Sequence, residues 1–376
     1  MRHPLAILAP YLPLRHAVTA GGWWIGPLKD FEGCWRDSRF EELVRLLAAS
    51  YKTHQGQPIP NPTLIVSEER GADGTWIEET ERRALQLSLD FTVLNGNPSL
   101  VDEAHRYAGW KVATTDNSQL HFWPVDLEQG QISHAAGTMV RALTGGYTIE
   151  SGYTAPPPIE MHFPFDRDLD DVLLAALLSV FRGEHDAVDA TFARRLATAV
   201  TWLAQLWRNT ESVRWEERII MVKTAFEALT GTSKSWPAAE SLEALFRTLP
   251  LRADADRFAQ YLVWKPSETA NMKRTHKGAE YECTPLQHWF MSLADCRNQI
   301  IHEGKADTLA YADDSSGYRG PFVFMGERIL REACRVALRR FGYDDLWKEW
   351  AWRVLARRLP AGPNRPQLPL DSDPGS

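Results

Sequence analysis

A run of three prolines separates two parts of the chain that have different sequence patterns. Pro156 to Pro158 lie within the segment 153–159. Because proline has no backbone N–H and a fixed φ, such a run neither continues a helix nor lies in a central strand. We therefore interpret 153–159 as a linker. A length of 376 residues is also consistent with two domains of ordinary size.

Before the linker, short apolar stretches alternate with turn residues, which is typical of a mixed α/β domain. The glycine pair before Trp23 and Trp24 indicates a loop that leads into a strand. We further predict strands at 63–66, 110–114 and 120–124, and a helix at 78–89.

After the linker, apolar residues recur at helical spacing, and Gly231 suits the end of one such helix. Helices are predicted at 168–182, 186–208, 212–230, 241–249, 253–264, 285–302, 327–341 and 345–358, with a polar, basic loop at 265–283. The prediction is thus an α+β chain. It has a mixed α/β domain at 1–160, an all-α domain at 165–359, and a disordered tail at 360–376 that is rich in proline, glycine, aspartate and serine.

Composition excludes several classes of protein. The formal net charge is −7, so contact with a nucleic acid would need a local basic surface. The four cysteines form no CxxC pair and the histidines no HExxH pair, so we expect neither a metal nor a cofactor. The longest apolar run, 172–181, is about half the length that crosses a bilayer. With no secretory signal visible, we expect a cytoplasmic protein that makes no membrane contact.

The segment 284–304 carries the most informative pattern. Thr284 and Gln287 match a capping box, Pro285 suits the first helical position, and Gly304 suits the end of the helix. At 100° per residue, one apolar stripe contains Leu286, Trp289, Phe290, Leu293, Ile300 and Ile301.

Arg297 falls within that apolar stripe. A guanidinium keeps its charge at accessible pH, so it needs either an internal carboxylate, such as Glu216 or Glu227, or a bound anion. Asn298 and His302 are i,i+4 neighbours on an adjacent face, with Asp295 on the same side. His302 lies about 140° around the helix from Arg297. A bend in the helix, or a second copy in a homodimer, would therefore be needed to bring the two side chains together.

The segment Arg297-Asn-Gln-Ile-Ile-His302, at the end of a long helix, resembles the Arg-x4-6-His motif of HEPN ribonucleases. The helix from Glu216 to Gly231, together with Trp289 and Phe290, resembles the Apea-like branch of that family. The resemblance covers about 168–342 and excludes the N-terminal part.

The resemblance implies a dimeric, metal-independent endoribonuclease that acts as a toxin or an antiviral defence effector. His302 would move protons and Arg297 would stabilise the charged phosphorane. Asn298 would orient His302 or bind a phosphate, and Glu227 would hold Arg297 or His302 in place. Lys273, Arg274 and Lys277 of the basic loop would follow the RNA backbone, as would Arg331, Arg335, Arg339 and Arg340. The N-terminal domain would then bind a regulatory ligand or protein.

Structural interpretations of the same residues remain open. Arg297 would then be a buried arginine paired with a glutamate, and His302 a helix-terminal residue that the helix dipole favours. Two other functions also fit the sequence. One is a non-catalytic HEPN module that binds RNA, a nucleotide or a partner protein, and the other is a bundle that only dimerises.

Overall fold

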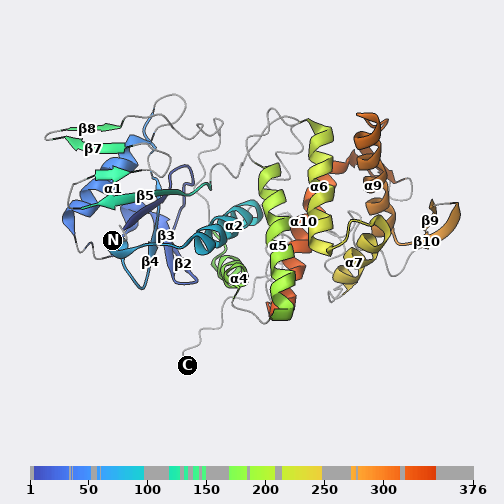
Figure 1. Cartoon of the computed structure of the whole chain (residues 1–376), viewed down its shortest axis with the longest axis horizontal. Coiled ribbons are helices and arrows are strands. Elements are labelled where there is room, and N and C mark those ends of the chain that lie inside the picture. The colour runs from blue at the N-terminus through green and yellow to red at the C-terminus, as the bar shows by residue number, and fades with distance from the viewer. Residues whose placement is uncertain are drawn as a thin grey trace, which may run out of the picture. The chain divides into compact units, whose positions relative to one another are not determined.

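The computed structural model describes residues 4–33, 35, 37–51, 57–59, 61–96, 118–127, 131–133, 139–143, 146–149, 169–183, 187–207, 214–247, 272–276, 278–313 and 318–343. The chain divides into two compact units (Figure 1). The first contains Met1–Glu184 and Trp207–Asn209, and the second contains His185–Leu206 and Thr210–Ser376. The described residues form both helices and strands, so the predicted mixture of α and β structure is confirmed. The linker at 153–159, the strand at 110–114, the helices at 253–264 and 345–358, and the tail lie outside the described residues.

The first unit is built on an antiparallel sheet of eight described strands in the order β2-β3-β4-β1-β5-β6-β7-β8. The strands are β1 (Leu5–Ala9), β2 (Val18–Ala20), β3 (Trp23–Pro27), β4 (Thr63–Ser67), β5 (His121–Asp126), β6 (Gln131–Ser133), β7 (Met139–Leu143) and β8 (Gly146–Ile149). The helices are α1 (Ser38–Ser50), α2 (Glu79–Gly96) and α4 (Asp171–Arg182), with short 3-10 turns η1 (Leu28–Asp30) and η2 (Ala72–Gly74). The strands predicted at Trp23, 63–66 and 120–124 and the helix at 78–89 are confirmed.

Helices cover both faces of this sheet. Side chains alternate between the two faces along each strand, so neighbouring residues of β1 contact different helices. Ala6 and Leu8 of β1 point towards α1, where they share a core with Phe40. Ile7 between them points to the opposite face, where it shares a second core with Leu85 of α2. Two apolar faces explain why both sides of the sheet need a helix layer.

Helix α4 belongs to the first unit, not to the helical unit in which we predicted it. It packs against α2 and β2, and its Leu174 and Leu178 lie in the second core of the sheet. Arg182 donates to the Gly21 carbonyl and to Glu81. The boundary therefore lies near residue 184, about twenty residues after the predicted one. An apolar helix is equally suited to a bundle or to the face of a sheet, and periodicity alone does not distinguish them.

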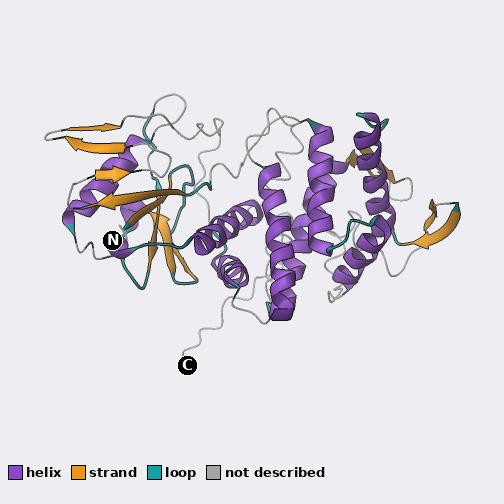
Figure 2. Ribbon diagram, viewed as in Figure 1, coloured by secondary structure: helices purple, strands orange, loops and turns teal. Residues whose placement is uncertain are grey.

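The second unit is mainly helical (Figure 2). Its helices are α5 (Ala187–Leu206), α6 (Trp215–Thr230), α7 (Ser235–Arg247), α9 (Pro285–Glu303) and α10 (Phe322–Ala337), followed by the 3-10 turn η4 (Leu338–Phe341). Helix α6 packs against α5, α7, α9 and α10. It ends at Gly231, which adopts φ 74°, a conformation that favours glycine.

The second unit also contains two β-hairpins, so the prediction of an all-α domain is wrong in this respect. Strands β9 (Met272–His276) and β10 (Ala279–Cys283) replace part of the predicted basic loop, and β11 (Ala310–Asp313) pairs with β12 (Tyr318–Pro321). The residues of β9 and β10 are mostly polar, so no apolar alternation indicated a strand. None of the described helices combines the length and apolar character that crossing a lipid bilayer requires.

Candidate functional site

Helix α9 carries the candidate site, and its local sequence sets both of its ends. Thr284 accepts a hydrogen bond from the Gln287 backbone N–H, and the Gln287 side chain accepts one from the Thr284 N–H, which completes the predicted capping box. Gly304 ends the helix in the left-handed conformation. The helix is continuous from Pro285 to Glu303, so its regular geometry applies through the whole motif.

The predicted apolar stripe of α9 is buried with one exception. Trp289 and Phe290 are fully buried. Phe226 of α6 packs edge-on against both, with ring centroids 5.9 and 5.5 Å away. Ile300 is buried but Ile301 is 47% exposed, so the stripe ends one residue earlier than predicted. This aromatic contact fixes the position of α9 against α6 and therefore of the residues that follow on α9.

Arg297 is half-buried and lacks an ion pair within the described residues. Its Nη1 donates to Oδ1 of Asn298 at 3.1 Å. Its Nε is buried and has no hydrogen-bond partner among the described residues. The alternative that we left open, a pairing with Glu216 or Glu227, is not formed among the described residues, and the Glu227 carboxylate is bound to a different cation. Among the described residues, no carboxylate thus neutralises the guanidinium charge.

That other cation is Lys223 of α6, which sequence reasoning missed. Its side chain is almost fully buried, with Nζ 2.8 Å from Oε1 of Glu227 and 5.0 Å from the centroid of Phe290. Burial lowers the pKa of Lys223; the hydrogen bond and the charge of Glu227 oppose this shift, and the charge of Arg297 adds to it. Lys223 lies four residues after Ile219 on α6, so helical spacing gave a signal that placed it towards the buried side.

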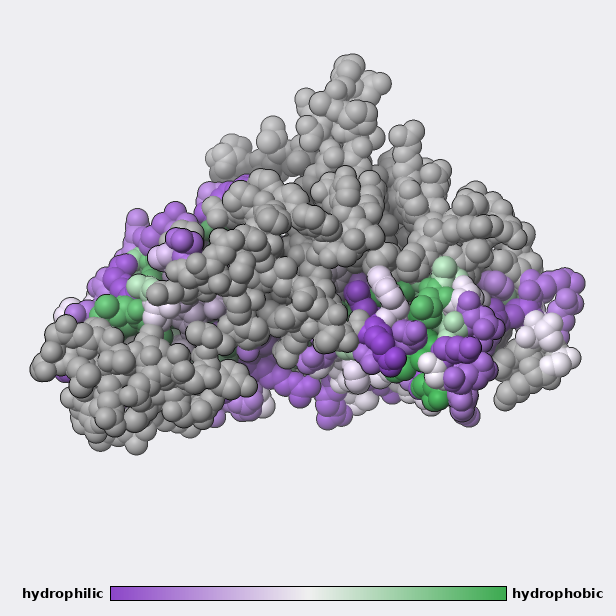
Figure 3. Space-filling model, turned by 90° about the horizontal axis from the view of Figure 1, so that it is seen from above, coloured by the Kyte–Doolittle hydropathy of each residue, from purple (hydrophilic) through white to green (hydrophobic). Residues whose placement is uncertain are grey.

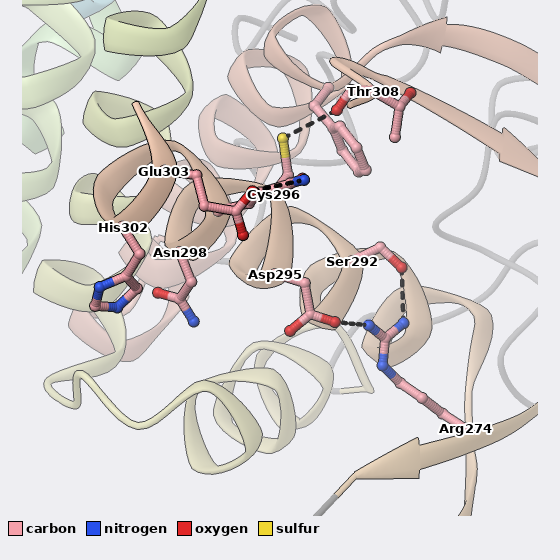
Figure 4. A pocket seen from close by; sticks show the side chains of 10 residues that line it. Arg274, Ser292, Asp295, Cys296, Asn298, His302, Glu303 and Thr308 are labelled. Atoms are coloured by element: carbon pink, nitrogen blue, oxygen red, sulfur yellow. Dashed lines mark hydrogen bonds and ion pairs between the residues drawn. The ribbon is translucent and has the colours of Figure 1, made fainter. Parts of the chain in front are cut away.

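Asn298 and His302 line a cavity of about 530 Å³ at the surface of α9. The described residues around it are Arg274, Ser292, Asp295, Cys296, Asn298, Gln299, His302, Glu303, Thr308 and Phe322. Figure 4 shows His302 and Asn298 side by side at one end of this cavity, with Asp295 farther along the helix. The predicted common face of Asp295, Asn298 and His302 is thus confirmed as the face that lines the cavity.

Arg297 does not line this cavity. Its neighbour Lys223 lies in the contact between α6 and α9, whereas His302 is exposed. Five residues of unbroken helix turn the two side chains about 140° apart. Asn298 links the two regions, because it bonds to Arg297 and lines the cavity with His302. Helix α9 runs unbroken through both residues, and a second copy, the other arrangement that we considered, would be one way to bring an Arg297 next to a His302.

The hairpin β9–β10 supplies Arg274 to the same cavity. Arg274 is ion-paired with Asp295 and donates to the Ser292 hydroxyl at 2.8 Å, so it connects the hairpin to α9. Lys273 pairs with Glu280 at 3.2 Å, and both side chains are exposed. Lys277 lies outside the described residues. Of the predicted RNA-backbone residues, Arg274 is thus engaged inside the protein and Lys273 lies at its surface.

The arginines of the helix predicted at 327–341 do not share one exposed face. Arg331 and Arg335 are 4% and 2% exposed, and neither can follow an RNA backbone from that position. Arg340 pairs with Asp189 at 2.8 Å and lies over the Phe192 ring. Arg331 and Arg335 lie four residues apart on α10, and both are turned into the protein.

Burial should protect the cysteines from reagents. Cys283, Cys296 and Cys334 are free and buried. Burial raises the pKa of Cys296 to about 11 and also raises the pKa of Cys283 and Cys334. At pH 8 a thiol with such a pKa is ionised in about one molecule in a thousand.

We therefore expect these three thiols to react slowly with Ellman's reagent at pH 8 in the native protein and rapidly after unfolding in guanidinium chloride. A Cys34→Ser background removes the signal of the remaining cysteine, which lies outside the described residues. A fast native phase of one or more thiols in that background would show that the buried arrangement is wrong.

Within the described ranges, no group of three or more His, Cys, Asp or Glu side chains is placed to hold a metal ion. No family model, curated protein or solved structure matches this chain.

Proposed function

We propose that the protein is a metal-independent endoribonuclease of HEPN type, whose site combines Arg297 and His302. The observation that carries the proposal is the state of Arg297. Its guanidinium is half-buried, has an unsatisfied Nε and lacks an ion pair in the described residues, and it lies beside a second buried cation. A charge left in this state favours binding of an anion, and an RNA phosphate is an anion that a planar guanidinium binds with two parallel hydrogen bonds.

The chemistry follows from these two groups. The ribose 2′-oxygen attacks the adjacent phosphorus, a P–O2′ bond forms and the P–O5′ bond breaks, which leaves a 2′,3′-cyclic phosphate and a free 5′-hydroxyl. His302 takes the 2′-hydroxyl proton and then gives it to O5′ as the P–O5′ bond breaks, since imidazole exchanges protons near neutral pH. Arg297 stabilises the negative charge on the phosphorane oxygens. No step requires a metal ion.

The two groups come from two copies in this proposal, because one unbroken helix holds them apart. Ile301, next to His302 on α9, is 47% exposed, and the proposal places it in the contact between the two copies. In the view of Figure 3, hydrophobic surface bordered by hydrophilic side chains lies on the second unit, towards the right of the picture. A twofold axis near this end of α9 would place each Arg297 beside the His302 of the other copy.

Incubation of the purified protein with total RNA and with tRNA in EDTA tests the proposal. We expect cleavage that EDTA does not inhibit, and products that carry 2′,3′-cyclic phosphate and 5′-hydroxyl ends. Loss of cleavage in EDTA would contradict the proposal. RNA binding without cleavage would favour the second candidate, a non-catalytic RNA-binding module. The separation of Arg297 and His302 within one chain is the observation that supports this candidate. Because activity can depend on a trigger, growth inhibition on expression in cells is measured beside the assay in solution.

A further inference from the structure

We propose that Lys223 is a positioning residue that holds the Glu227 carboxylate and so keeps Arg297 free for an RNA phosphate. The inference rests on the proposed function, because it assigns the guanidinium to a phosphate. It adds a residue that lies on a different helix and has no part in the Arg-x4-His motif.

The three charged groups form one cluster at the contact between α6 and α9. The Lys223 ammonium is 2.8 Å from Glu227 and interacts electrostatically with Arg297. The cluster therefore has two cations and one carboxylate, and the carboxylate bonds to the Lys223 ammonium. The cluster has one positive charge in excess, and this excess lies on the group whose Nε is buried and unsatisfied.

Stability does not explain the lysine. A buried ammonium loses its hydration, and replacing a buried ion pair with apolar side chains of similar volume is often neutral or stabilising. Lys223 stands before Glu227 at i,i+4, which is the less favourable order for a helix. The apolar surroundings, which include Phe290, suit a methionine equally well by shape. A lysine at this position is therefore better explained by what it does to its charged neighbours.

The effect of removing Lys223 follows from the charges. Without the ammonium, Glu227 is a partly buried carboxylate that lacks its cation, and Arg297 is the nearest remaining cation of the cluster. An unpaired carboxylate in such surroundings is costly, so Glu227 should turn to Arg297 and neutralise it. Phosphate binding would then have to compete with an internal ion pair.

A double-mutant cycle tests this prediction. Lys223→Met should lower RNA cleavage, and the affinity for a non-cleavable 2′-O-methyl RNA, by about tenfold or more. Lys223→Met combined with Glu227→Gln should recover most of that loss, because no carboxylate remains to pair with Arg297. Glu227→Gln alone completes the cycle, and Lys234→Met, at an exposed site, is the matched control. A purely structural role for the Lys223–Glu227 pair predicts no recovery in the double variant.

A second readout is independent of RNA. The Nε–H signal of Arg297 in ¹⁵N-arginine-labelled protein, assigned with Arg297→Lys, should shift in Lys223→Met and return in the double variant. Unchanged signals, or a double variant no better than the single one, would overturn the inference. If the wild type neither binds nor cleaves RNA but the Arg297 signal shifts as expected, the proposed function fails. The role of Lys223 in holding the Glu227 carboxylate away from Arg297 would still stand. Lys223→Gln replaces the methionine variant if that variant does not fold.

Discussion

Replacement of Arg297 with alanine should reduce the rate of RNA cleavage by about a hundred- to a thousandfold, because loss of one preorganised charge donor costs about that much in a transition state. Replacement of His302 with alanine should reduce it by about a hundred- to ten-thousandfold, the usual contribution of a group that transfers protons. The measurement is a single-turnover rate on a labelled RNA in EDTA, so that product release does not hide the chemical step.

The controls for these variants are exposed residues of the same types, Arg214→Ala and His16→Ala. Both should keep the wild-type rate. Arg297→Lys should recover little, because an ammonium lacks the planar pair of donors. Wild-type rates for Arg297→Ala or His302→Ala, with folding verified by circular dichroism, would remove both residues from the reaction.

Replacement of Phe226 with alanine should lower the free energy of unfolding of the second unit by about 3–5 kcal/mol, the usual cost of removing a large aromatic side chain from a packed core. Phe226 is fully buried and contacts both Trp289 and Phe290. The measurement is guanidinium unfolding followed by tryptophan fluorescence. Because the chain has two units, their transitions are fitted separately.

Trp215→Ala is the comparison for this experiment, because Trp215 begins the same helix and is 43% exposed. We expect a change of about 0.5 kcal/mol or less at such a surface position. A loss of less than about 1 kcal/mol for Phe226→Ala would mean that α6 and α9 do not share the aromatic core described here. The site would then lack the contact that positions Arg297.

Helix α9 was predictable because several local signals agree. Thr284 and Gly304 mark its ends, and the apolar stripe has helical period over many residues. The face that lines the cavity followed from the same geometry, since Asp295, Asn298 and His302 are related by helical spacing. The strand at 63–66 was similarly clear, because it is a short β-branched run that becomes fully buried.

Other features depend on contacts between segments that sequence spacing does not reveal. The strands of the hairpin β9–β10 consist mostly of polar residues, so they lack an apolar alternation. Arg331 and Arg335 have the spacing of a solvated basic face, yet they are buried. Helix α1 at Ser38–Ser50 was not predicted, although Asp37 caps its first turn. The Lys223–Glu227 pair has i,i+4 spacing within α6 and was missed, whereas its place beside Arg297 depends on how α6 and α9 pack.

Dimers that combine two different variants test whether Arg297 of one copy acts together with His302 of another. Arg297→Ala and His302→Ala chains are co-expressed with different affinity tags, and the mixed dimer is purified through both tags. One site of the mixed dimer would then contain both intact residues and the other would contain neither, so we expect cleavage at about half of the wild-type rate. A mixed dimer as inactive as either parent, beside an active wild type, would contradict it.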